Sequence, residues 1–194
     1  MRNHFDMERA QKDMKEHLSE KRYKHSYAVA ETARKLAELH GEDPDRAYIA
    51  GLFHDFAKYL KQEESAAYLR EMQVEDAFLL GDANLAHGEI AAYILAKDYG
   101  LDDAGILSAI AKHTFGDVKM SRLDKIVYLA DAIEPNRHYE EVEKLRKIAR
   151  RDLNEACFEY LKNNFKHLLS ENKRIYTKSV EMYNRILEGG TDGF

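Results

Sequence analysis

The sequence predicts an all-α protein, and three observations support this fold class. Proline occurs only twice and glycine ten times in 194 residues, a composition that suits helices joined by short turns. Apolar residues recur every three or four positions along most of the chain, whereas the strict alternation of β-strands is hard to find. Residue types that favour helix ends, such as Asp43 followed by Pro44, divide this pattern into segments.

In the N-terminal half, helices are expected over residues 7–19, 25–40, 43–58 and 62–72. The second of them carries Val29, Ala33 and Leu36 at helical spacing and stops at Gly41, a natural C-terminal cap. The third begins at Asp43 and has a proline in its first turn. The fourth is short and amphipathic.

In the C-terminal half, helices are expected over residues 86–99, 102–113, 121–134, 140–150, 152–170 and 178–187. Gly100 closes the first of these. Ser121 and Asp124 form a capping box for the third, which ends before Pro135. Residues 189–194 are expected to be a frayed tail. No repeat, low-complexity tract or linker marks a domain boundary, so residues 1–194 are expected to form one domain.

The bulk composition excludes several classes of protein. The formal net charge of −5 argues against a protein that coats nucleic acid, because such proteins present a strong positive field. No run approaches the roughly 18 apolar residues of a membrane span, and residues 1–18 are too charged for a signal peptide. The single cysteine, Cys157, forms no intramolecular disulfide and is expected to be buried. We therefore expect a cytoplasmic protein that binds neither nucleic acid nor membrane.

Several polar residues fall where the helical pattern predicts a buried face. Asp131 continues the face that carries Leu123 and Val127, and a carboxylate there is costly unless it is paired or binds a cation. His54 follows a face of small residues that permits another helix to approach closely, and His113 extends an apolar face. Each has an ordinary structural explanation when taken singly. A core histidine usually satisfies its hydrogen bonds, and an aspartate at a helix end is often solvated or a cap.

Taken together, these residues predict a metal centre. Four histidines and two aspartates lie at helix ends or on inward faces: His25, His54, Asp55, His87, His113 and Asp131. Imidazole and carboxylate ligands without cysteine suit iron, manganese, zinc or similar divalent metals. Adjacent side chains on a helix diverge by about 100°, so His54 and Asp55 can reach different sides of a metal cluster.

The order of these six residues resembles that of the HD-domain phosphohydrolases, whose core pattern is a histidine, an adjacent His-Asp pair and a later aspartate. The surrounding sequence is similar to one branch, the YqeK family of bacterial symmetrical bis(5′-nucleosyl)-tetraphosphatases. The similar segments are residues 21–26, 50–58, 113–114 and 120–137. The last of them, which ends in Glu134-Pro135-Asn136-Arg137, is the most specific.

The resemblance implies a single-domain HD helical bundle that holds metal. Its metal-binding core would span about residues 21–137, and the helices of residues 138–188 would pack on this core. One metal would be held by His25, His54, Asp55 and Asp131, and a second by Asp55, His87 and His113. Iron, divalent or trivalent, is the expected metal, and manganese, cobalt and zinc are the alternatives.

The resemblance also implies a substrate and the residues that contact it. The expected reaction is symmetrical cleavage of diadenosine tetraphosphate into two ADP by a metal-activated hydroxide. Asp55 and Lys58 are the expected catalytic residues. Substrate contacts are expected from Arg22, Lys58, Thr114, Asn136, Arg137 and Tyr139. The partner would be a dinucleoside polyphosphate or an ADP- or GDP-like product, and a homodimer is left open.

Three residues depart from the family pattern. Glu89 follows Gly88 where a proline is usual, Phe115 replaces a common threonine, and Thr177 stands where a proline is common. None of them removes a ligand, so they concern the nucleotide pocket. Two alternatives stay open: another HD nucleotide phosphohydrolase, such as a nucleotidase or a deoxynucleoside triphosphohydrolase, and a nucleotide-binding regulator without turnover. A purely structural helical module does not explain the inward-facing Asp131.

Overall fold

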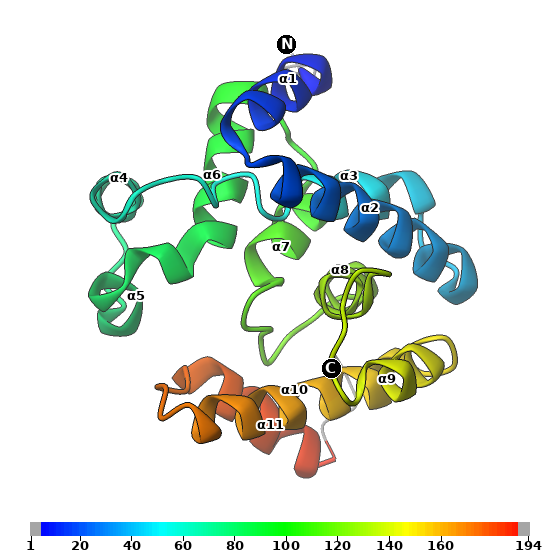
Figure 1. The fold of residues 1–194 in the computed structure, drawn as a ribbon. Helices are drawn as coiled ribbons and strands as arrows, with labels where there is room; N and C mark the ends of the chain where they lie inside the picture. Colours follow the sequence, from blue (N-terminus) through cyan, green and yellow to red (C-terminus); the bar gives the residue numbers. More distant parts are fainter. Residues whose placement is uncertain (1–4, 190–194) are drawn as a thin grey trace.

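The computed structural model describes residues 5–189, and this part of the chain contains helices and turns but no strand (Figure 1). In chain order the helices are α1 (Met7–His17), α2 (Glu20–His40), α3 (Pro44–Phe53), α4 (Gln62–Glu71), α5 (Ala77–Gly81), the 3₁₀ helix η1 (Ala83–Ala86), α6 (His87–Tyr99), α7 (Ala104–Lys112), α8 (Arg122–Ile133), α9 (Val142–Ala149), α10 (Leu153–Ser170) and α11 (Thr177–Leu187). The predicted all-α class is confirmed. The predicted tail lies, apart from Gly189, outside the described residues.

Two helices begin elsewhere than the sequence suggested. α2 starts directly after Ser19, because the hydroxyl of this residue caps the helix by accepting a hydrogen bond from the Arg22 amide (3.3 Å). His25 therefore lies inside the helix and not at its start. α7 is capped by Asp103, whose carboxylate accepts hydrogen bonds from two backbone amides, and not by the expected Asp102.

α3 ends earlier than expected, and its end presents two adjacent polar side chains. The expected helix ran to Lys58, but α3 stops at Phe53 and residues 54–59 form turns. The first of these turns is closed by a hydrogen bond from the Phe56 amide to the Phe53 carbonyl (3.0 Å). His54 and Asp55 thus occupy a helix terminus, where the backbone leaves the helix direction and the two side chains point to different sides.

Two short helices between α4 and α6 were not predicted. α5 has five residues and η1 has four, which is too short for a helical repeat of apolar residues to show in the sequence. The carboxylate of Asp76 caps α5 by accepting hydrogen bonds from the amides of Phe78 (2.9 Å) and Leu79 (3.2 Å). This cap fixes the position of the Phe78 ring, which lines the cavity described below.

α2 and α3 approach each other closely at Gly51. A Cβ atom on this residue would lie 2.9 Å from Cα of Ala30 and 3.2 Å from Cβ of Ala33, which is closer than packed atoms tolerate. The small residues of α3 therefore permit the close helix approach that the sequence predicted. The contact brings His54, directly after α3, toward α2.

α8 is the central helix of the fold, and ten of its twelve residues are buried. α2, α3 and α7 pack on one side of it, and α9 and α10 pack on the other (Figure 1). Tyr128 of α8 meets Tyr160 of α10 with ring centroids 5.0 Å apart. Asp131, in the last turn of α8, is therefore held between the N-terminal and C-terminal groups of helices.

Cys157 lies on α10 and is fully buried, as the sequence predicted. None of the helices within residues 5–189 combines the length and the apolar character that a membrane crossing needs.

Candidate metal centre

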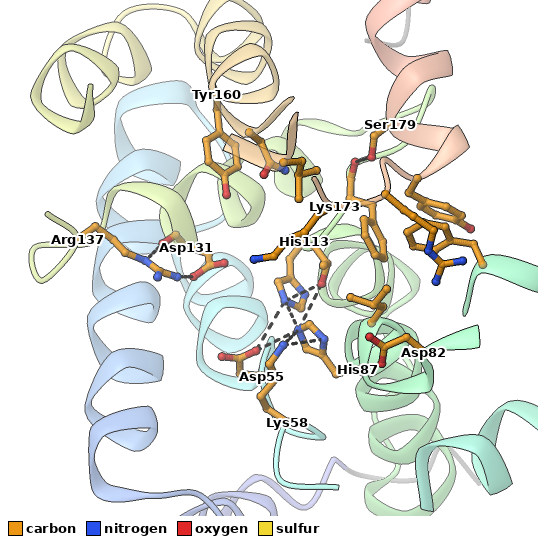
Figure 2. Close-up of a pocket in the computed structure, with 18 of the residues that line it drawn as sticks. Asp55, Lys58, Asp82, His87, His113, Asp131, Arg137, Tyr160, Lys173 and Ser179 are labelled. Carbon is orange, nitrogen blue, oxygen red and sulfur yellow. Dashed lines mark hydrogen bonds and ion pairs between the residues drawn. The ribbon is translucent and has the colours of Figure 1, made fainter. Parts of the chain in front are cut away.

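Five elements bring four histidines and two aspartates together. Figure 2 shows four of these six residues: Asp55, His87, His113 and Asp131. α2 contributes His25, and the turn after α3 contributes His54 and Asp55. α6 begins with His87, His113 directly follows α7, and α8 contributes Asp131. They form three overlapping groups, and within each group the potential ligand atoms lie within 4.8 Å of one another. All six residues predicted from the sequence thus meet at one place.

The closest approaches join the two carboxylates to the imidazole rings. Nε2 of His25 lies 3.0 Å from Oδ1 of Asp131. Nε2 of His87 lies 3.2 Å from Oδ1 of Asp55. His54 lies between the two carboxylates, because its Nε2 is 3.4 Å from Asp55 and 3.8 Å from Asp131. Asp55 therefore touches both halves of the cluster and is placed as a bridge.

The backbone sets the tautomers of three of the histidines. Each has its Nδ1 within hydrogen-bond distance of the carbonyl oxygen three residues earlier: His54 with Gly51 (2.7 Å), His87 with Asn84 (3.1 Å) and His113 with Ile110 (2.7 Å). A carbonyl oxygen only accepts, so Nδ1 donates its proton and Nε2 keeps a free lone pair. These lone pairs point into the cluster, as metal ligation requires.

A buried carboxylate sets the tautomer of the fourth histidine. Nδ1 of His25 lies 3.2 Å from Oε1 of Glu134, whose other oxygen accepts a hydrogen bond from the Asn136 amide (2.6 Å). The residue is only 2% exposed. A carboxylate behind a metal-ligating imidazole orients the ring and increases its basicity. This contact of Glu134 was not predicted, although its position three residues after Asp131 was a usable signal.

The donor set fits a metal. Nε2 of His25 and Nε2 of His54 are buried without a hydrogen-bond partner among the described residues. Nε2 of His87 faces Nε2 of His113 at 3.0 Å, and two lone pairs at this distance repel each other. Two buried acceptors without donors and two acceptors that face each other are costly. Cations among these four nitrogens would stabilise all of them. Nitrogen and oxygen donors without a thiolate suit iron, manganese, cobalt or zinc.

The electrostatics keep most of these groups in the protonation state of a ligand. Burial, together with the charge of His54, lowers the pKa of His113 to about 3, so this ring is neutral. Burial opposes ionisation of Asp131, but the adjacent His25 and the charges of His54 and Arg137 outweigh it and lower the pKa of the carboxyl group. Burial also disfavours a charge on His54, yet the Asp55 carboxylate prevails and raises its pKa. A metal ion therefore competes with a proton at His54.

Four residues of the cluster, Asp55, His87, His113 and Asp131, line a cavity of about 640 Å³. Of the predicted substrate residues, Arg22, Lys58, Thr114 and Arg137 line this cavity. Nζ of Lys58 lies 3.2 Å from Nδ1 of His87. Desolvation by the cavity walls lowers the pKa of Lys58, against the attraction of Asp55. Oγ1 of Thr114 lies 3.2 Å from Nε2 of His113.

The two arginines each hold one carboxylate of the cluster. Nη1 of Arg22 donates to Oδ2 of Asp55 at 2.7 Å. Arg137 donates both to Oδ1 of Asp131 and to the backbone oxygen of the same residue (2.8 Å). Both guanidinium groups are more than a third exposed. They are therefore placed directly beside the cluster and open to an anion from the cavity.

The other two predicted substrate residues do not line this cavity. Asn136 and Tyr139 line a neighbouring one, of about 730 Å³, on the other side of Arg22 and Arg137. The Asn136 side chain donates to Glu134 (3.0 Å), and the Tyr139 hydroxyl donates to a backbone carbonyl of α8 (3.1 Å). Both side chains thus make hydrogen bonds within the fold, whether or not they also bind substrate.

The residues match a known family. A model of the HD domain covers residues 22–136. The chain belongs to the HD domain family. This segment contains all six clustered histidines and aspartates, so the predicted family and the predicted fold class are confirmed.

Two relatives and one solved structure resemble this HD domain protein over nearly its whole length. The symmetrical bis(5′-nucleosyl)-tetraphosphatase of Halalkalibacterium halodurans is 42% identical over 90% of this chain and 93% of its own. The Bacillus subtilis protein of the same name is 36% identical over 91% and 95%. A predicted HD superfamily hydrolase from Clostridium acetobutylicum, described as involved in NAD metabolism, matches with a TM-score of 0.91. It is 35% identical, and the match covers 95% of this chain and 98% of the other.

One wall of the HD domain cavity was not predicted as a site. Phe78, Phe115 and Tyr176, here called the aromatic arm, stand at the end of the cavity away from Arg137. The Phe78 and Tyr176 rings stack with centroids 4.7 Å apart, and Phe115 lies 4.6 Å from Tyr176. The guanidinium of Arg174 covers Phe78 at 4.9 Å. These residues come from three distant segments, so no sequence pattern connects them.

Proposed function

We propose that this HD domain protein is a metal-dependent hydrolase that cleaves diadenosine tetraphosphate symmetrically into two ADP. The observation that carries the proposal is the convergence of six imidazole and carboxylate groups beside one cavity. Four of these groups, those of Asp55, His87, His113 and Asp131, line the cavity together with the cations of Arg22, Lys58 and Arg137. The two relatives that match 90% and 91% of this chain are named symmetrical bis(5′-nucleosyl)-tetraphosphatases, which supports this substrate. The fold alone would not identify the substrate, because one fold serves many activities.

Two metal ions are the cofactor that we propose. His25, His54, Asp55 and Asp131 would hold one, and Asp55, His87 and His113 would hold the other. When bound, such ions lower the pKa of water and withdraw charge from phosphoryl oxygens. Iron is the metal that we propose, with manganese, cobalt and zinc as alternatives compatible with the same donors.

The residues of the chain itself orient the substrate and balance its charge. Arg22 contacts the carboxylate of Asp55, and Arg137 contacts that of Asp131. Each guanidinium can also bind a phosphate through two hydrogen bonds. Lys58 adds a third cation beside His87. Thr114 offers a hydroxyl at the same depth. Three cations next to the bond that breaks counter the charge that develops on the leaving phosphate.

The cellular setting also stays a proposal. A single buried cysteine suits a reducing compartment, and we keep the cytoplasm as the proposed location. The proposed partner is a small dinucleotide and not a nucleic acid, in keeping with the net charge of −5. A homodimer stays open.

Product analysis tests the proposed reaction. Protein loaded with iron, manganese or cobalt is incubated with diadenosine tetraphosphate, and the nucleotides are separated by chromatography. We expect two ADP for each substrate consumed. ATP and AMP in equal amounts would contradict symmetrical cleavage. Faster hydrolysis of mononucleotides would favour another HD phosphohydrolase, and tight nucleotide binding without turnover would favour a regulator.

A pair of variants tests the role of the cluster. Asp55→Ala removes the bridging carboxylate, so it should abolish turnover and reduce bound metal. Asp45→Ala, at the other end of α3, changes an exposed aspartate whose side chain is 88% accessible and serves as the control. Equal activity of the two variants would remove the proposed mechanism.

A further inference from the structure

The 640 Å³ cavity that contains Asp55, His87 and His113 is here called the main cavity. It and the neighbouring cavity both reach residues of the cluster. The neighbouring one, here called the basic cleft, lies between the start of α2 and the connection from α8 to α9. Arg22 and Arg137 line both cavities. Both volumes, about 640 and 730 Å³, fall within the range of about 300–1,000 Å³ that small-molecule sites occupy. Two spaces of ligand size therefore adjoin at a pair of arginines.

The boundary between them coincides with the clustered carboxylates. Arg22 donates to Asp55 and Arg137 donates to Asp131, so each boundary residue stands on one acidic member of the cluster. In Figure 2, Arg137 and Asp131 lie at one side of the cluster and Ser179 lies at the opposite end of the main cavity, with His113 between them. The proposed cleavage point is thus at the junction of the cavities, not at the end of either.

The two cavities differ in chemistry. The main cavity ends in the aromatic arm, whose Phe78 and Phe115 rings are only partly buried. Aromatic rings of this kind stack on the face of a purine base and do not distinguish one base from another by its hydrogen-bonding edge. The basic cleft has Lys21 and Lys24 in addition to the two shared arginines, and its aromatic component is Tyr139, which is 37% exposed. The cleft therefore offers cations with little ring surface, whereas the arm offers stacked rings with the cations of Lys173 and Arg174 beside them.

Symmetrical cleavage requires that the substrate site hold a nucleoside diphosphate half on each side of the bond that breaks. When the central anhydride of a four-phosphate chain lies at the metal cluster, one nucleoside and two phosphates extend in each direction. A cavity that ends at the cluster would hold only one of these halves. This reasoning rests on the proposed function and specifies how its substrate is held.

We propose that the protein binds the two halves of its dinucleotide in unlike subsites. The aromatic arm receives the base of one nucleoside diphosphate half, and the basic cleft receives the other half chiefly through its phosphates, with Lys21 and Lys24 as the added contacts. Free ADP, without the second half of the substrate, binds in the arm subsite. Stacking on the aromatic rings gives it a higher affinity there than the exposed lysines give in the cleft.

A double charge reversal in the cleft tests this assignment. Lys21→Glu with Lys24→Glu should raise the KM for diadenosine tetraphosphate about tenfold, leave kcat within twofold, and leave the inhibition constant of ADP unchanged. The matched control is Lys12→Glu with Lys35→Glu, which makes the same change of net charge at exposed positions on α1 and α2 outside both cavities. The control should keep the KM of the wild type.

The aromatic arm is tested by Phe115→Leu, which keeps an apolar side chain at the site but removes the ring. This variant should raise both the KM for the dinucleotide and the inhibition constant of ADP severalfold. Circular dichroism confirms that each variant is folded. The assignment is overturned if the cleft variant keeps the KM of the wild type, or if it weakens ADP as much as it weakens the dinucleotide.

Failure of this inference is separable from failure of the proposed function. The products of wild-type turnover are measured first, and two ADP per substrate establish the reaction without reference to the cleft. With that reaction established, an unchanged KM in the cleft variant rejects the second subsite alone. Without turnover by the wild type, binding of a non-hydrolysable dinucleoside tetraphosphate analogue, measured by calorimetry, replaces the KM. The expected loss on double charge reversal is the same.

Discussion

Oε1 of Glu134 lies 3.2 Å from Nδ1 of His25, and the carboxylate is almost inaccessible to solvent. This pair joins the end of α8 to the second turn of α2, two elements more than a hundred residues apart in the chain. A carboxylate in this position holds the ring so that Nε2 faces the cluster. Glu134 is therefore a positioning residue for the metal centre, not a ligand.

Replacing Glu134 by glutamine should weaken metal binding and leave the fold intact. The amide oxygen can still accept a hydrogen bond from His25, but the amide nitrogen then faces the Asn136 donors and cannot accept from them. The negative charge is also lost, so the imidazole becomes a weaker metal ligand. We expect the metal affinity to fall about tenfold or more, as measured by competition with a chelator. Glu140→Gln, an exposed neighbour, is the control. Equal affinities of the two variants would leave Glu134 a structural role only.

Gly88 adjoins the hydrogen bond that orients another ligand. A Cβ atom there would lie 2.8 Å from the Ile110 carbonyl oxygen and 3.0 Å from Nδ1 of His113. Nδ1 of His113 donates a hydrogen bond to this carbonyl oxygen. Gly88→Ala should therefore lower stability by about 1–3 kcal/mol and also lower metal affinity. Thermal unfolding and metal titration measure the two effects.

The control for this variant is Gly81→Ala, because the nearest atom to the added Cβ would be the end of the flexible Arg174 side chain, at 3.5 Å. It should change neither stability nor metal affinity measurably. A Gly88→Ala protein that is destabilised but binds metal normally would contradict the role of the Ile110–His113 hydrogen bond.

Asp103 supplies a pH-dependent contribution to stability. Hydrogen bonds from Arg46 at 2.7 and 2.9 Å lower its pKa, and it caps α7. A lowered folded-state pKa means that its stabilisation is full above the ordinary value of about 3.9 and is lost as pH falls below it. Asp103→Ala should therefore reduce the free energy of unfolding by about 1 kcal/mol at pH 7.

Denaturant unfolding at pH 7 and near pH 3 tests this dependence. The difference between wild type and Asp103→Ala should shrink at the lower pH. Asp102→Ala, one residue earlier and exposed, should have little effect at either pH. A larger loss for Asp102→Ala would mean that the cap of α7 is assigned to the wrong residue.

Cys157 should be chemically inert in the folded protein. It is fully buried in α10, and burial raises the pKa of its thiol, so little reactive thiolate forms. A thiol reagent should modify one group per chain only after denaturation. Ser170→Cys, at the exposed end of α10, should react at once in the folded state. Rapid modification of the native wild type would contradict the packing of α10.

Much of the fold and the cluster was accessible from the sequence. The 3.6-residue repeat predicted α8 and showed that Asp131 continues its buried face. The small residues before His54 predicted the close approach of α2 and α3. A buried polar residue on an apolar stripe is costly in free energy, and this cost is visible in the sequence without any knowledge of the contacts.

The remaining features depend on which distant segments meet. The aromatic arm combines residues from α5, from the end of α7 and from the approach to α11, and none of these short stretches has a repeat. The start of α2 was placed too late because the periodic apolar residues begin after the Ser19 cap. The division of substrate contacts between two cavities, which separates Asn136 from Thr114, likewise appears only in the folded chain.

Anomalous X-ray scattering from crystals of the metal-loaded protein tests the central claim most directly, because it locates metal ions independently of activity. The account predicts peaks between the Nε2 atoms of the four clustered histidines, next to Asp55 and Asp131, and their loss in Asp55→Ala. Crystals that bind the metal only elsewhere, while these six side chains keep their hydrogen bonds to one another and to water, would contradict it.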